Sequence, residues 1–148
     1  MDLKKFIRSI PDYPKKGILF RDITTLIKDE KAFEETINQI IERSKKYSFN
    51  KVAAIESRGF VFASAVSYVL KKPFIMLRKK NKLPAETHSI DFELEYGTAT
   101  IEVHKDSINE NDSVLIIDDL IATGGTAEAA AKLVELSKGS VSGFIFVH

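Results

Sequence analysis

The sequence has no cysteine among its 148 residues, which excludes disulfide scaffolds, zinc sites with thiolate ligands and cysteine nucleophiles. It also lacks an excess of one charge, because 22 Lys and Arg oppose 21 Asp and Glu. This balance argues against a protein that coats nucleic acid or an anionic membrane surface. No apolar run approaches the roughly 18 residues of a transmembrane helix, and the N-terminal stretch lacks the apolar core of a secretory signal. We therefore expect a cytoplasmic protein.

What remains is the composition of an ordinary globular domain. Hydrophobic residues make up 44% of the chain and charged residues 29%. A chain of this length is close to the usual size of one domain, and it can bury about 68–70% of the surface of its unfolded state. No internal repeat or low-complexity tract is visible. We therefore expect a single domain over residues 1–148.

Strand-like and helix-like segments alternate along the chain. Four short apolar runs have the length of buried strands, at 52–55, 73–77, 113–117 and 141–147. Four longer segments favour helices, at 2–10, 30–47, 59–70 and 126–136. Asp29 is placed to cap the second helix, and 17–23 should form an extended arm. This alternation predicts an α/β fold with a central, mostly parallel sheet and helices on both faces.

Residues 78–104 interrupt the alternation. The first part is polar and carries four cations within five positions, Arg78, Lys79, Lys80 and Lys82. The second part alternates between apolar and polar residues on both sides of Gly97, which predicts an antiparallel β-ribbon. Long polar insertions in α/β domains are more often lids than linkers. We therefore expect a mobile lid that is inserted into the domain at about 78–104.

The most informative segment is VLIIDDLIATGGT, residues 114–126. A hydrophobic strand leads into two carboxylates, then into a Thr-Gly-Gly-Thr turn and a helix. Such a turn directs several backbone N–H groups at one point, and the helix N-terminus adds partial positive charge, so the turn suits a phosphate monoester. Neither a Walker A loop nor a G-x-G-x-x-G fingerprint is present. The residues expected to hold the phosphate are Ala122, Thr123, Gly124, Gly125 and Thr126.

Two carboxylates, Asp118 and Asp119, come directly before this turn. Carboxylates repel phosphate, so they should face another part of the same ligand. A pair of ribose hydroxyls is the natural partner, with a bound Mg²⁺ close by that the substrate carries and that neither residue need ligate directly. The alternative is a strand end followed by an ordinary helix cap.

The segment 114–126 resembles the phosphoribosyl pyrophosphate signature of the type I phosphoribosyltransferases. Three further segments resemble the members of that family that use adenine: YPKKGILFRDI at 13–23, IESRGF at 55–60 and LEYG at 94–97. All four occur in the family's order and spacing, and the resemblance extends from about residue 3 to the end. It implies the family's α/β fold with a β-ribbon lid, and transfer of the 5-phosphoribosyl group from phosphoribosyl pyrophosphate to adenine. It also implies AMP and pyrophosphate as products, Mg²⁺ as cofactor and a homodimer.

The resemblance assigns diphosphate binding to two segments. The loop 56–59 corresponds to the family's pyrophosphate loop, where Ser57 and Arg58 would bind diphosphate, and a guanidinium suits oxyanions better than an ammonium does. The family's other diphosphate-binding positions correspond to Arg78, Lys79 and Lys82. By pattern alone, the loop could be a connecting turn with a surface arginine, and the cations a solvated charge run or a nucleic-acid patch.

At the tip of the ribbon, Glu95 and Tyr96 correspond to lid residues that close over the site. The resemblance implies catalytic roles for Glu95 and Arg58, with Glu95 either handling a proton at the base or pairing with Arg58. An ordinary hairpin turn is the alternative. The sequence has Asp91 and Phe92 where the family often has Ser-Tyr, so the lid lacks one hydroxyl.

The resemblance also places the adenine. Backbone groups of Leu19 and Arg21 would contact the edge of the base, with Phe20 on one face and Leu120 on the other, although the pattern alone indicates only core and a surface arginine. The chain ends at His148, where the family usually continues with another strand and a helix. Three alternatives stay open: an enzyme for hypoxanthine–guanine or xanthine, a regulator that only senses phosphoribosyl pyrophosphate, and an inactive homologue.

Overall fold

The computed structural model describes residues 2–94, 97–119 and 124–147. Its main sheet has the strand order β5-β6-β4-β3-β7-β8. The four strands on the β8 side pair in parallel: β4 (Phe74–Lys79), β3 (Lys51–Ile55), β7 (Ser113–Asp118) and β8 (Ser140–Phe146). The two strands on the other side are antiparallel: β5 (Thr87–Leu94) and β6 (Gly97–His104). The prediction of a mostly parallel central sheet is confirmed.

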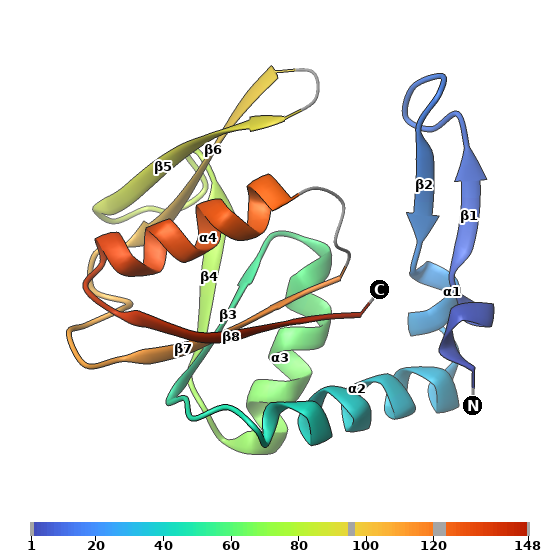
Figure 1. Cartoon of the computed structure of the whole chain (residues 1–148), viewed down its shortest axis with the longest axis horizontal. Helices are drawn as coiled ribbons and strands as arrows, with labels where there is room; N and C mark the ends of the chain where they lie inside the picture. Colours follow the sequence, from blue (N-terminus) through green and yellow to red (C-terminus); the bar gives the residue numbers. More distant parts are fainter. Residues whose placement is uncertain (1, 95–96, 120–123, 148) are drawn as a thin grey trace.

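Helices cover both faces of this sheet, as Figure 1 shows. They are α1 (Thr24–Ile27), α2 (Glu30–Ser44), α3 (Arg58–Leu70) and α4 (Gly124–Leu136). Alternate residues of a strand point to opposite faces. Val52 and Ala54 of β3 therefore join the core under α2 and α3, while Ala53 and Ile55 join the core under α4. No helix in the described ranges is long and apolar enough to cross a membrane.

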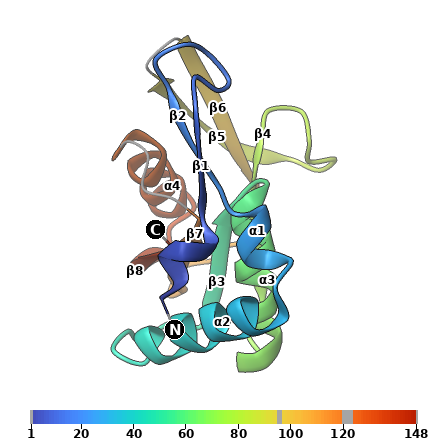
Figure 2. The same cartoon turned by 90° about the vertical axis from the view of Figure 1, so that its right-hand side faces the viewer.

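The N-terminal segment differs from the prediction of a helix over 2–10. A short 3₁₀ helix, η1 (Leu3–Phe6), is followed by β1 (Arg8–Pro11), which pairs antiparallel with β2 (Leu19–Asp22). Tertiary pairing overrides the helical spacing, because the strand gains both a hydrogen-bonded ladder and an ion pair between Arg8 and Asp22. The extended arm is confirmed as β2. The β1–β2 hairpin stands beside the main sheet, on the side toward which β7 and β8 run (Figures 1 and 2).

The predicted ribbon is confirmed as β5 and β6, although β5 begins earlier than expected, at Thr87. The ribbon is hydrogen-bonded to the main sheet, because β6 pairs with β4 through the partners Arg78–Glu102 and Lys79–Ile101. Leu94 pairs with Gly97 across the turn, and Gly97 has φ +147°, a conformation that favours glycine. The ribbon is therefore an extension of the sheet beyond β4.

Candidate active site

The predicted site residues follow neighbouring strands at one edge of the sheet. β3 leads into the loop with Ser57 and Arg58, and its parallel neighbour β7 leads into Asp118 and Asp119. β4, the neighbour of β3 on the other side, ends with Arg78 and Lys79. Carboxyl ends of parallel strands meet at the same edge, which is where open α/β sheets bind their ligands.

Arg58 joins three of the predicted subsites. Its Nε lies 2.8 Å from Oδ2 of Asp119, an ion pair between the pyrophosphate loop and the carboxylates after β7. Its Nη1 donates to the carbonyl oxygen of Arg21 at 3.3 Å, and its guanidinium carbon lies 5.0 Å from the ring centroid of Phe20. A cation at this distance from an aromatic face is attracted to it. Segments separated by about a hundred residues of sequence thus meet at one side chain.

The two carboxylates are held against one another in a poorly solvated place. Oδ1 of Asp118 accepts a hydrogen bond from the backbone N–H of Asp119 at 2.8 Å. The Asp119 side chain is 8% exposed, and its Oδ2 accepts no hydrogen bond within the described residues, although it is ion-paired with Arg58. Burial, a hydrogen bond to Asp119 and the charge of Asp119 together raise the pKa of Asp118 to about 7. The pair can still accept hydroxyl donors or a cation.

Gly59 explains why the loop after β3 can lie so close to these carboxylates. A Cβ at this position would lie 3.1 Å from Oδ1 of Asp118 and 3.3 Å from the carbonyl oxygen of Ile117. Both distances are tighter than ordinary van der Waals contact. The glycine therefore lets the first turn of α3 pack directly on the end of β7.

Glu56 is a site residue to which the sequence pattern assigned no role. Its Oε1 accepts from Nε of Arg78 at 3.2 Å and from the backbone N–H of Lys79 at 2.6 Å, and its side chain is only 11% exposed. The peptide bond to Ser57 is cis. The sequence feature that could have indicated this role is the position of Glu56 directly after β3, beside the end of the parallel strand β4. Lys79, the last residue of β4, and Lys82, on the turn that follows, are both exposed.

The arm is anchored at its base and open at its tip. Asp22 accepts from the backbone N–H and hydroxyl of Thr24 and from Arg8, and these contacts, with the Thr24 N–H first, lower the pKa of Asp22 to about 2. Phe20 is half-buried, with its ring edge-on to Tyr13 at 5.1 Å between centroids. Leu19 is 51% exposed. Of the predicted adenine contacts, Phe20 and Arg21 are thus next to Arg58, whereas Leu19 faces solvent.

The described residues hold only part of the predicted phosphate turn. Gly124, Gly125 and Thr126 form the start of α4, two residues before the predicted helix, so they belong to a helix N-terminus that favours anions. The structure describes neither the remaining phosphate residues, Ala122 and Thr123, nor three further predicted positions, Glu95, Tyr96 and Leu120. Among the described residues, no three His, Cys, Asp or Glu are grouped so that they could hold a metal ion by themselves.

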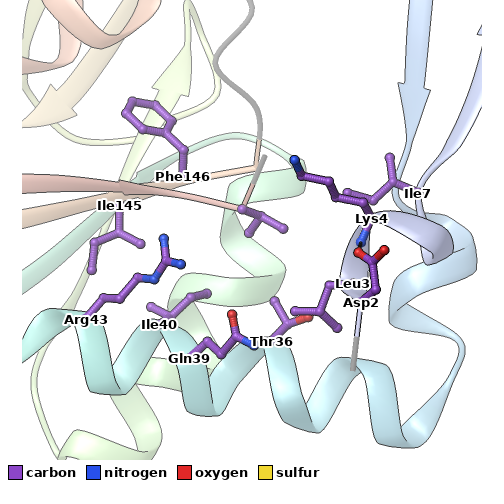
Figure 3. Close-up of a pocket in the computed structure, with 11 residues that line it drawn as sticks. Asp2, Leu3, Lys4, Ile7, Thr36, Gln39, Ile40, Arg43, Ile145 and Phe146 are labelled. Atoms are coloured by element: carbon purple, nitrogen blue, oxygen red, sulfur yellow. Dashed lines mark hydrogen bonds between the residues drawn. The ribbon is translucent and has the colours of Figure 1, made fainter.

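A cavity of about 420 Å³ lies elsewhere, between η1, α2 and the end of β8 (Figure 3). Its lining includes Lys4, Thr36, Arg43 and Phe146. None of the predicted site residues that the structure describes lines it, and its described walls lack the paired carboxylates and the glycine-rich approach of the site at β3 and β7. The cavity is therefore separate from the candidate active site.

Comparison with known proteins bears on the same residues. Residues 23–143 match the model of the phosphoribosyl transferase domain. The adenine phosphoribosyltransferase of Pelagibacter ubique is 83% identical over 146 residues, which cover 99% of this chain and 83% of the relative. The chain belongs to the adenine phosphoribosyltransferase family. Another member, from Kosmotoga olearia, is 50% identical over 98% of this chain and 85% of its own.

Solved structures of adenine phosphoribosyltransferases share the fold. The crystal structure from Thermoanaerobacter pseudethanolicus superposes with a TM-score of 0.95 at 50% identity, over 98% of this chain and 84% of that one. The Saccharomyces cerevisiae enzyme, solved with adenine and an imino-altritol bisphosphate, gives 0.90 at 33% identity, over 98% and 85%. The predicted type I phosphoribosyltransferase fold and the predicted adenine branch of the family are therefore both confirmed.

Proposed function

We propose that the chain transfers the 5-phosphoribosyl group of phosphoribosyl pyrophosphate to N9 of adenine, giving AMP and pyrophosphate in purine salvage. The observation that carries this proposal is Arg58, which contacts Asp119, Arg21 and Phe20 at once. These residues are the expected ribose and adenine subsites. Relatives solved with adenine, or with 9-deazaadenine in the Giardia lamblia enzyme, support the choice of base.

Catalysis would be positioning and charge stabilisation, because the transfer needs no covalent intermediate with the protein. The sugar carbon is expected to pass through an oxocarbenium-like state, as in glycoside chemistry. Asp118 and Asp119 would accept from the 2- and 3-hydroxyls of the ribose and offset the positive charge on the ring. Arg58 and Arg78 would stabilise the leaving diphosphate, together with Ser57, Lys79 and Lys82. The 5-phosphate would lie at residues 122–126.

Mg²⁺ fits this arrangement as a companion of the substrate. Carboxylate oxygens are hard ligands of the kind that Mg²⁺ takes, usually together with substrate oxygens and water. The buried Oδ2 of Asp119 accepts no hydrogen bond in the described structure, so it has capacity for such a contact. When bound, the ion would neutralise part of the diphosphate charge. Asp118 and Asp119 would hold it near the ribose without forming a complete metal site of their own.

We also propose that residues 78–104 act as a lid whose tip carries Glu95 and Tyr96. Ile101 and Val103 of β6 are buried in the core near β4, whereas Ile90 and Phe92 of β5 are only partly buried against it. Amide exchange at 87–104 should slow when phosphoribosyl pyrophosphate and Mg²⁺ bind. Equal exchange with and without ligand would argue against a lid.

A cytoplasmic homodimer is the expected form of the enzyme. α3, which begins in the pyrophosphate loop, exposes an apolar stripe at i, i+7 and i+8: Val61 at 37%, Tyr68 at 86% and Val69 at 55%. Exposed apolar patches mark interaction sites, and two-fold dimers are the commonest soluble oligomers. Light scattering should give the mass of two chains, and Tyr68→Glu should shift it toward one.

The test of the reaction is a steady-state assay with each purine base. With phosphoribosyl pyrophosphate and Mg²⁺, adenine should give AMP and pyrophosphate, whereas hypoxanthine, guanine and xanthine should give little product. Equal use of hypoxanthine would contradict the adenine assignment. Tight binding of phosphoribosyl pyrophosphate without turnover of any base would favour a regulator or an inactive homologue.

A further inference from the structure

Residues 78–82, here called the basic turn, are held at both ends by carboxylates. At the first end, Oε1 of Glu56 accepts from Nε of Arg78 and from the backbone N–H of Lys79, at 3.2 and 2.6 Å. Glu56 comes directly after β3, and its side chain is 11% exposed. It therefore fixes both the side chain and the backbone of the turn where the turn leaves β4.

At the other end, Glu102 of β6 takes the corresponding role. Its Oε1 accepts from the backbone N–H of Asn81 at 2.9 Å, while Oε2 accepts from the hydroxyls of Thr87 and Ser89 at 3.1 and 2.7 Å. These contacts, with Ser89 first, lower the pKa of Glu102, so the carboxylate stays charged at neutral pH. Glu102 is also the cross-strand partner of Arg78 in the pairing of β4 with β6.

The turn needs such support because of its charge. Lys79, Lys80 and Lys82 are all exposed on four consecutive positions, and their like charges repel one another without an anion between them. Asn81 adopts φ +68°, a left-handed conformation that closes the turn between Lys79 and Lys82. Two carboxylates that accept from the turn's own N–H groups offset this charge and fix where the lysine side chains begin.

We propose that Glu56 and Glu102 are positioning residues that hold the basic turn in the geometry that binds the diphosphate of phosphoribosyl pyrophosphate. Neither glutamate touches the substrate; each acts through the turn. The proposal rests on the proposed function, because it assumes that the cations bind diphosphate. Hydrogen-bond donors that are already in position lose less conformational entropy when the anion binds. Removing either glutamate should therefore weaken the binding of phosphoribosyl pyrophosphate more than that of adenine.

The experiment compares Glu56→Ala and Glu102→Ala with a matched control, Glu86→Ala. Glu86 lies between the basic turn and β5, its side chain is 86% exposed, and its ion pair with Lys105 is long, at 3.9 Å. Each glutamate variant should raise KM for phosphoribosyl pyrophosphate about tenfold, while KM for adenine changes less than about twofold. Glu86→Ala should change neither. Glu102→Gln, which retains an acceptor oxygen for Asn81, should recover most of the loss.

A double-mutant cycle separates positioning from simple support of the ribbon. If Glu102 acts through the turn, Glu102→Ala should have a much smaller effect on KM for phosphoribosyl pyrophosphate in a Lys82→Ala background. Additive effects, or equal changes in the KM of both substrates, would overturn the proposal. Loss of the fold in both alanine variants would assign the glutamates to stability and overturn it as well. A wild-type chain that makes no AMP would instead contradict the proposed function.

Discussion

Two ion pairs lie beside the parallel strands β3 and β7, one at each end of the strand pair, and they are built differently. At the amino end, Nζ of Lys51 lies 2.6 Å from Oδ2 of Asp112; at the carboxyl end, Nε of Arg58 lies 2.8 Å from Oδ2 of Asp119. Both acids are at most 10% exposed. The two ends of this strand pair thus carry similar ion pairs in different surroundings.

The amino-end pair is completely hydrogen-bonded. Asp112 also accepts from the Asn50 side chain at 2.9 Å and from the backbone N–H of Asn109 at 2.8 Å, while Lys51 donates to the carbonyl oxygen of Ser107 at 3.0 Å. Burial alone would raise the pKa of Asp112, but the hydrogen bonds from Lys51, Asn109 and Asn50 outweigh it and lower the pKa. Both carboxylate oxygens of Asp112 have donors within the protein, so we assign this pair to the stability of the fold.

The carboxyl-end pair lacks this support. Oδ2 of Asp119 accepts no hydrogen bond among the described residues, and the adjacent Asp118 has its pKa raised to about 7. Two ion pairs with similar distances can therefore have different roles, and the number of hydrogen bonds to the carboxylate oxygens distinguishes them. The incomplete pair belongs to the site.

The largest effect is expected at the amino end. Asp112→Ala leaves the ammonium of Lys51 buried without its partner, and breaking a buried pair in this way costs about 3 kcal/mol of unfolding free energy. Urea denaturation should show this loss, while kcat per folded molecule stays close to wild type. Asp106→Ala, an exposed neighbour, is the control. Unchanged stability in Asp112→Ala would contradict the assignment of the Lys51–Asp112 pair to the stability of the fold.

The second largest effect is expected on catalytic activity, at the carboxyl end of the strand pair. Asp119→Asn should lower kcat/KM for phosphoribosyl pyrophosphate about a hundredfold, or about 2.7 kcal/mol, because it removes the carboxylate that we propose holds the sugar and offsets its charge. KM for adenine should change much less. The unfolding free energy should change by less than about 1 kcal/mol, because the removed charge was incompletely paired. A variant that unfolds, or one with wild-type kinetics, would make Asp119 a structural residue like Asp112.

The third effect is a pH dependence of stability. The folded-state pKa of Asp118, about 7, is above the value of 3.8 for an ordinary carboxyl, so the folded protein binds the proton more tightly than the unfolded chain. Its stabilising contribution is complete below about pH 4 and is lost as pH rises to about 7, by at most roughly 1.4 kcal/mol per pH unit.

Urea denaturation from pH 5 to 8 should therefore show wild type losing stability relative to Asp118→Asn, with the difference levelling off above pH 7. A difference that stays constant across this range would mean that Asp118 is ionised throughout. Asp112→Asn should show no such change from pH 5 to 8, because the pKa of Asp112 is lowered and its stabilising contribution is lost only as pH falls below this range.

The smallest effect concerns the close approach at Gly59. Gly59→Ala places a Cβ 3.1 Å from Oδ1 of Asp118, and overpacking of this kind costs about 1–3 kcal/mol, while alanine in a helix gains up to about 1 kcal/mol over glycine. A small net loss of stability is expected, with a several-fold drop in kcat/KM because Asp118 must move. Ser64→Ala, on the exposed face of the same helix, should leave activity unchanged. Wild-type activity in Gly59→Ala would show that the position of Asp118 is not critical.

Much of the fold could be predicted from local pattern. The strands at β3, β4, β7 and β8 are short apolar runs, and Asp29 caps α2 as expected, accepting from the backbone N–H of Ala32 at 2.9 Å. The prediction of an N-terminal helix was wrong. The spacing of Phe6, Ile7 and Ile10 does not reveal that Arg8 forms an ion pair with Asp22. Such partners are separated in sequence and are set only by the tertiary fold.

The site, too, has one part that could be predicted from the sequence and one that could not. The carboxylates and the phosphate turn are visible in the sequence because their chemistry depends on residue type and spacing. The contacts of Arg58 with the Arg21 carbonyl and the Phe20 ring are not, since a backbone acceptor leaves no trace in sequence. Glu56 was missed for a similar reason: its role depends on which strand lies beside β3.

The pairing of β6 with β4 has a mechanical consequence. The ribbon is attached to the sheet through two rungs, at Arg78–Glu102 and Lys79–Ile101, and extends from there to Gly97. At about 3.3 Å per residue, Gly97 is about 13 Å from the nearer rung, so a tilt of about 10° moves the tip by roughly 2 Å. In the proposed lid, these rungs would serve as the hinge and the two strands as the arm that moves. Because Arg78 belongs to one of these rungs, a tilt of the ribbon would also move the guanidinium that donates to Glu56.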